Sequence, residues 1–106
     1  MVNSADKQGK EEDAVLTANA LKAMAHPIRW RILCALGERE LTVREIIEKV
    51  GTTQSNVSQH LEILRNKHII NSRKEGNRVF CSVRNQQLQL LIENMRGVLC
   101  KTTLDD

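Results

Sequence analysis

The chain has 106 residues, the usual length of one domain. Hydrophobic residues make up 41% and charged residues 27%, a globular composition, and no apolar run approaches the roughly 18 residues that a membrane span needs. These values exclude two domains within this chain and a membrane-spanning helix.

The first residues, MVNSADKQGKEED, have neither the apolar stretch nor the cleavage site of a signal peptide, so we expect a cytoplasmic protein. Three cysteines in that reducing compartment do not suggest a structural disulfide framework, which would favour an even count in a secreted domain. We therefore expect Cys34, Cys81 and Cys100 to pack, to bind a ligand or to react as thiols.

The net charge is +3, and the charges are segregated along the chain. Residues 65–84 contain six basic residues and one acidic residue, whereas the first 13 residues contain four acidic residues and two lysines. A basic segment of this kind is typical of a small domain that contacts phosphates. A scatter of solvated surface charges would give the same pattern, and the charge alone leaves both interpretations open.

Residues 1–11 are expected to form a disordered leader, residues 12–102 the folded domain, and residues 103–106 a tail. From Glu12 to Ala25, apolar residues recur at helical spacing on more than one side, which predicts a helix with two neighbours.

His26 and Pro27 begin a second predicted helix, because proline fits the first turn of a helix, and Gly37 ends it. We expect His26 to be the residue that caps this helix.

The next two predicted helices form a helix-turn-helix. Thr42 and Glu45 have the spacing of a capping box for the third helix, which ends at Gly51. Thr52 and Thr53 then supply capping groups for a fourth helix. Its apolar face repeats at i, i+4 and i+7, with Val57, Leu61 and Leu64. Two short helices joined by a glycine turn are typical of this motif.

After Ile70 the apolar period changes to two, which predicts strands over residues 71–74 and 78–83 around a turn of glycine and asparagine. The alternation places Cys81 on the apolar face of this β-hairpin, so we expect it to pack in the core. A last helix follows from about Asn85. The first and last helices carry more apolar surface than one small core can use, which predicts a homodimer built through them.

The polar face of the fourth predicted helix is a candidate for reading DNA. Ser55 and Ser58 are poor helix formers at positions that usually carry lysine, glutamate or alanine, so a requirement other than helix stability favours them. An ordinary solvated face is the alternative. The residues expected to contact double-stranded DNA are Thr53, Gln54, Ser55, Ser58, Gln59 and His60 on this helix, and Arg73, Lys74, Asn77 and Arg78 on the hairpin.

Three segments carry a family resemblance: LKAMAHPIRWRILCAL, ELTVREIIEKVGTTQSNVSQHLEILRNKHII and RKEGNRVFCSV. Over about residues 15–100 the chain resembles the ArsR/SmtB family of winged-helix bacterial repressors, and TQSNVSQHLEIL is the most specific string. The resemblance implies a mainly α winged helix-turn-helix of order α-α-α-α-β-β-α. It also implies a homodimer that binds a palindromic operator and releases it when an inducer acts. His68 stands where the family usually has glycine, and histidine tolerates a left-handed backbone better than most residues.

The metal sites of the family are absent from this sequence. Relatives with a thiolate site resemble ELCVCDL in the third helix, whereas this chain has ELTVREI, with Thr42 and Arg44 at the thiol positions. Relatives with a zinc site on the last helix carry aspartate and histidine pairs there, and residues 85–101 contain neither. We therefore predict no metal site of these kinds and no cofactor.

Two cysteines match the persulfide- and redox-responsive branch of the family, the BigR, SqrR and HlyU type. Cys34 lies in the RILC segment and Cys100 near the end of the last helix. Arg31 and Arg96 lie near these thiols in helical phase and are expected to favour the thiolate. The resemblance implies that a persulfide or oxidant reacts with one thiol. The second then closes a disulfide or polysulfide bridge that releases DNA.

Other interpretations stay open at this point. A metal- or arsenite-responsive repressor could use all three cysteines, or the cysteines could be inert. A winged-helix module that binds protein instead of DNA is an alternative of another class. An enzyme is not expected, because no nucleophile, base and orienting acid form a plausible constellation.

Overall fold

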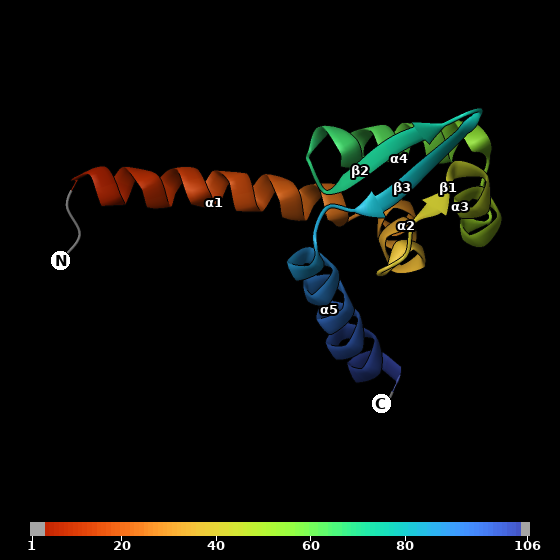
Figure 1. Cartoon of the computed structure of the whole chain (residues 1–106). Coiled ribbons are helices and arrows are strands. Elements are labelled where there is room, and N and C mark those ends of the chain that lie inside the picture. The colour runs from red at the N-terminus through yellow and green to blue at the C-terminus, as the bar shows by residue number, and fades with distance from the viewer. Residues whose placement is uncertain (1–3, 105–106) are drawn as a thin grey trace.

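A computed structural model gives the backbone of residues 4–104 and the side chains of residues 9–100; residues 1–3 and 105–106 lie outside the described part. The elements in chain order are α1 (Ser4–Met24), α2 (Pro27–Leu36), β1 (Leu41–Thr42), α3 (Val43–Val50), α4 (Gln54–Asn66), β2 (Ile70–Glu75), β3 (Arg78–Val83) and α5 (Gln86–Leu104). Three helices, α2, α3 and α4, pack with a small sheet, while α1 and α5 extend from this body in different directions (Figure 1). The predicted winged helix-turn-helix fold is confirmed.

Both ends of the chain differ from the sequence-based prediction. The first helix begins at Ser4, so residues 4–11, predicted to be a disordered leader, are helical. Lysine, glutamine and glutamate in this stretch are good helix formers, and extending an existing helix costs far less than nucleating one. The predicted tail differs in the same way, because α5 continues to Leu104.

A short strand that the sequence does not predict completes the sheet. β1 pairs antiparallel with β3, which also pairs with β2, so the strand order is β1-β3-β2. Leu41 lies opposite Cys81, and Thr42 lies opposite Phe80. Two residues are too few to show a period of two, but their pairing joins the start of α3 to the hairpin that forms the wing.

The predicted helix caps are confirmed. The Ile28 amide donates to Nδ1 of His26 over 3.1 Å, and the capping box at the start of α3 is complete. The Asn56 amide donates to the Thr53 hydroxyl over 3.1 Å at the start of α4. His68 has a φ of 58°, the left-handed backbone expected where the family has glycine.

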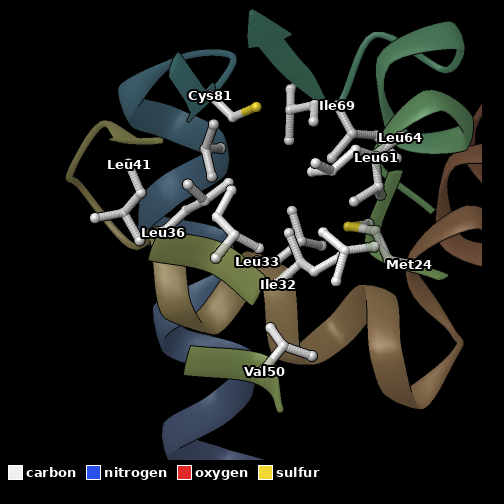
Figure 2. Packing of buried hydrophobic residues seen from close by; sticks show 14 of the residues in the cluster. Met24, Ile32, Leu33, Leu36, Leu41, Val50, Leu61, Leu64, Ile69 and Cys81 are labelled. Atoms are coloured by element: carbon white, nitrogen blue, oxygen red, sulfur yellow. The ribbon is translucent and has the colours of Figure 1, made fainter. Parts of the chain in front are cut away.

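The core lies between α2, α4 and the inner side of the sheet. Leu33, Leu36, Leu61 and Leu64 are buried, and Figure 2 shows their side chains converging with Cys81 on the sheet side. Cys81 is 0% exposed, and its sulfur lies 3.5 Å from the Ser72 hydroxyl. The prediction that this cysteine packs in the core is confirmed.

The two extended helices expose apolar side chains, as their sequences predict. The large exposed residues are Val15, Leu16 and Leu21 on α1 and Leu90, Leu91, Val98 and Leu99 on α5. Within the described range, none of the helices combines the length and the hydropathy of a membrane span.

Candidate nucleic-acid interface and thiol site

The helix α4, the second of the predicted helix-turn-helix, presents one apolar and one polar face. Val57, Leu61 and Leu64 bury the apolar face against the core. The polar face is exposed and carries the predicted DNA-reading residues Gln54, Ser55, Ser58 and Gln59, together with the cap Thr53. A polar face held rigidly by a buried opposite face can offer amides and hydroxyls to base edges.

An open groove of about 1240 Å³ joins α4 to the wing. Gln54 and Ser58 line it from α4, and Asn77 and Arg78 line it from the hairpin tip, so the structure brings both predicted sets together. Sequence reasoning missed Arg44 of α3 and Arg65 of α4, which line the same groove. Its charge is mixed rather than uniformly basic, because Glu45, Glu48 and Glu62 line it too.

Arg73 is placed differently from the prediction. Its Nε and Nη2 donate to the Glu40 carboxylate over 2.9 and 2.7 Å, and its Nη1 donates to Glu75 over 2.5 Å. The guanidinium also lies 4.4 Å from the centre of the Phe80 ring. Hydrogen bonds to Glu40 and then Glu75 raise the pKa of Arg73. These contacts assign Arg73 to holding the base of the wing, which argues against the predicted phosphate contact.

His60 also turns away from the predicted DNA face. Its ring lies against that of His26 with the centroids 4.4 Å apart and the planes tilted by 37°, and its Nδ1 is buried without a hydrogen-bond partner among the described residues. Burial, and then the charges of His26 and Arg29, lower the pKa of His60. The side chain therefore connects α4 to the start of α2, which argues against the predicted contact with DNA.

The two candidate sensing cysteines have different surroundings. Cys34 is half-buried, Cys100 is exposed, and both are free thiols. Burial raises the pKa of the Cys34 thiol; the positive charge of Arg96 opposes this rise, and Cys100 adds to it. Arg96 therefore lowers the pKa of Cys34 as predicted, but burial raises this pKa by more. Arg31, also expected to lower it, is not among the causes. Cys34 therefore favours its protonated form, contrary to the expectation from helical phase.

A cavity of about 320 Å³ opens beside Cys34, between the end of α2 and the first half of α5. Its lining combines the thiol with charges of both signs and an amide. It includes Cys34, Glu38, Arg39, Gln89, Glu93 and Arg96. The sequence did not indicate this cavity, because residues on two helices and a loop far apart in the chain form it.

The side chains described between residues 9 and 100 include no group of three histidines, cysteines, aspartates or glutamates that could hold a metal ion. Cys34, Cys81 and Cys100, the ligands of the alternative metal or arsenite site, form no such group. Cys81 instead lies buried in the core.

Residues 26–72 match the family model described as bacterial regulatory protein, arsR family. The chain is also 35% identical over 94 residues to the transcriptional activator HlyU of Vibrio cholerae, an alignment covering 89% of this chain and 87% of that protein. The chain belongs to the arsR family of bacterial regulatory proteins. It is a transcriptional regulator of this family, whose helix-turn-helix is formed here by α3 and α4.

Solved structures of arsR-family proteins have the same fold. The structure of reduced HlyU from Vibrio cholerae aligns with a TM-score of 0.80 at 35% identity, covering 88% of this chain and 98% of that one. The transcriptional repressor BigR from Xylella fastidiosa aligns with a TM-score of 0.77 at 29% identity, covering 89% and 96%. One relative is named an activator and the other a repressor, so family membership by itself leaves the direction of regulation open.

Proposed function

We propose that this regulator is a homodimeric repressor that leaves its operator when a persulfide or an oxidant links Cys34 to Cys100. The observation that carries the proposal is the contact of α2 with α5, where Cys34 and Arg96 line the same cavity. Cys100 follows Arg96 by four residues in α5, which puts both on the same side of that helix.

The persulfide chemistry needs only the donor and the two thiols. A cysteine thiolate attacks the terminal sulfur of a persulfide R–S–SH, the donor S–S bond breaks, and R–S⁻ leaves. The second cysteine thiolate attacks the sulfur of the modified cysteine side chain, a disulfide forms, and HS⁻ leaves. If both cysteines carry an extra sulfur, the same displacement gives a trisulfide. With a peroxide, the first thiolate becomes a sulfenic acid, which condenses with the second thiol and releases water.

The fold supplies a route from this bridge to DNA. A covalent link would tie the end of α5 to α2, and α2 contacts α4, with the ring of its cap His26 against that of His60. A change in the position of α2 would therefore reach the recognition helix. It would also reach the dimer, because α5 carries part of the exposed apolar surface.

The homodimer would be built from that surface. Leu16 of α1 is 67% exposed and Leu91 of α5 is 48% exposed, and all seven of the large apolar side chains exposed in the described part of the chain lie on these two helices. Exposed apolar patches mark interaction sites, whereas single exposed leucines do not. A second copy of the chain would cover both helices with the same patch, as two-fold symmetry requires. The dimer would set the spacing of its two recognition helices along the operator.

DNA contacts divide into two groups in this proposal. Gln54, Ser55, Ser58 and Gln59 would meet base edges from the exposed face of α4, where their amides and hydroxyls can donate and accept. Lys74, Asn77 and Arg78 at the exposed wing tip would contact the backbone and contribute affinity without sequence choice.

The test uses a duplex selected by the reduced protein from a random-sequence library. Fluorescence anisotropy would follow the duplex before and after treatment with glutathione persulfide, for wild type and three cysteine variants. We expect wild type and the buried-site control Cys81→Ala to lose affinity, and Cys34→Ser and Cys100→Ser to stay bound. Release of Cys34→Ser to the wild-type extent would contradict the proposal. If the library yields no preferred sequence and DNA binding vanishes at moderate salt, the result would favour a module that binds protein instead of DNA.

A further inference from the structure

The cavity beside Cys34 surrounds a thiol with two cations and two anions. Arg39 and Arg96 supply the positive charges, and Glu38 and Glu93 the negative ones. Arg39 is held in place by a hydrogen bond of 2.6 Å from its Nη2 to the Ala35 carbonyl at the end of α2. Arg96 lines the same cavity as Cys34, and its positive charge opposes the rise that burial causes in the pKa of this thiol. Each side of the cavity, the segment after α2 and the helix α5, thus supplies one charge of each sign, which complements a ligand that carries both an ammonium and a carboxylate.

The remaining lining residues and the size of the cavity fit a small organic molecule. Gln86 and Gln89 contribute amides that can donate to and accept from peptide groups, and Ile92 adds apolar surface. A volume of about 320 Å³ lies at the lower end of the range for small-ligand sites, roughly 300–1,000 Å³. A lone ion would leave most of this space unfilled.

We infer that this cavity binds the persulfide of an amino-acid or short-peptide thiol and places its terminal sulfur against Cys34. The inference rests on the proposed function and deepens it, since it adds a noncovalent site that holds the donor beside Cys34 before the reaction. The donor carboxylates would pair with Arg39 and Arg96. Its ammonium would pair with Glu38 or Glu93.

Binding explains how a protonated, half-buried thiol can be the reacting group. Burial keeps the pKa of Cys34 above its ordinary value, so its thiolate is scarce and unassisted collisions with a donor would be slow. A donor held beside the sulfur raises its effective concentration and offsets this loss. The Cys34 proton goes to solvent, and the thiolate attacks the terminal sulfur of R–S–SH. The donor S–S bond breaks, and R–S⁻ takes up a proton, leaving a persulfide on Cys34 and a free thiol R–SH.

The kinetic test compares a zwitterionic donor with a neutral one in a Cys100→Ser background, where no bridge can form. The rate of Cys34 persulfidation would be measured by mass spectrometry with glutathione persulfide and with the persulfide of 2-mercaptoethanol. We expect the rate to reach a plateau as the concentration of glutathione persulfide rises, and to stay proportional to the concentration of the neutral donor. We also expect Arg39→Gln and Arg96→Gln to lower the ratio of the two rate constants by about tenfold each, the effect of one lost charge-assisted contact. The ratio separates binding from a change in thiol pKa, because such a change affects both donors equally.

The matched control is Arg31→Gln, an exposed arginine on α2 that does not line the cavity. This variant should keep the wild-type ratio. Equal rate constants for the two donors in the parent protein, with no saturation, would overturn the inference.

Binding without reaction separates this inference from the proposed function. S-methylglutathione cannot transfer sulfur, and its titration into the reduced protein would be followed by amide chemical shifts. We expect saturable shifts at the end of α2 and the first half of α5, and none on the polar face of α4. If S-methylglutathione causes saturable shifts but persulfide never releases the protein from DNA, the proposed function is overturned and this inference stands. Release of DNA by persulfide without any such shifts would overturn this inference alone.

Discussion

The imidazole of His26 contacts that of His60 at a centroid distance of 4.4 Å, with the rings tilted by 37°, and His26 is also the residue that caps α2. The contact joins the helix that carries Cys34 to the helix that carries the predicted DNA-reading face. Neither ring is fully exposed, and Nδ1 of His60 has no hydrogen-bond partner among the described side chains. Protonation of His60 is therefore coupled to the packing of α4 against the start of α2.

Acid should destabilise the protein through His60. Burial, His26 and Arg29 lower its pKa in the folded state, so the unfolded chain binds the proton more readily. Stability should be full above the ordinary histidine pKa of about 6.5 and fall as the pH drops below it. Urea unfolding midpoints at pH 7 and pH 5 measure this, and His60→Gln should shrink the difference. His68→Asn is the control at an exposed site, because asparagine also tolerates the left-handed backbone there. This variant should keep the full difference between the two midpoints. An unchanged difference in His60→Gln would count against this assignment.

Arg73 should contribute little to the electrostatics of DNA binding. Its guanidinium is occupied by Glu40 and Glu75, so Arg73→Gln should leave the salt dependence of operator affinity unchanged. Lys74→Gln, at the exposed wing tip, should reduce the slope of log affinity against log salt by about one. Anisotropy titrations at several salt concentrations provide both slopes. An equal loss of slope in Arg73→Gln would restore Arg73 to the phosphate-binding set.

Ser58→Ala should weaken operator binding by about tenfold without changing the dimer, because Ser58 is exposed on the reading face and lines the groove to the wing. Anisotropy measures the affinity and ultracentrifugation the oligomeric state. Gln87→Ala, an exposed amide at the start of α5, is the control. Wild-type affinity in Ser58→Ala would remove this hydroxyl from the interface.

Charges placed on the exposed apolar faces of α1 and α5 should separate the protomers. Leu16→Glu and Leu91→Glu each put a carboxylate where a second copy would pack, and both side chains are already exposed in one protomer. Ultracentrifugation should show monomers, with the helical circular dichroism retained. Lys67→Glu, at an exposed site off these helices, should remain dimeric. Dimers in both leucine variants would place the interface elsewhere.

The Cys34 thiol should ionise above its ordinary pKa. Burial is the largest cause, and Arg96 opposes it, so Arg96→Gln should raise the pKa further. The pH dependence of iodoacetamide alkylation in Cys100→Ser measures both values, since Cys81 is buried. A midpoint below the ordinary thiol value would show that charge, not burial, dominates at this site.

The features that sequence predicts are those whose causes lie close together in the chain. Thr42 and Glu45 form a capping box three residues apart, and the left-handed backbone at His68 follows from the end of one helix. The pairing of Arg73 with Glu40 joins residues 33 positions apart and leaves no periodic signal. Helical phase likewise does not predict the contact of His60 with His26, because a wheel shows which side of α4 His60 occupies but not what lies against it.

The central claim, that Cys34 and Cys100 are joined when the regulator leaves DNA, is tested most directly by a non-reducing peptide map. Reduced protein bound to its selected duplex would be treated with glutathione persulfide, and released and bound fractions would be alkylated, digested and analysed by mass spectrometry. We predict a peptide linking Cys34 to Cys100, as a disulfide or with added sulfur, in the released fraction only. Released protein in which both cysteines are separately alkylated would contradict the account.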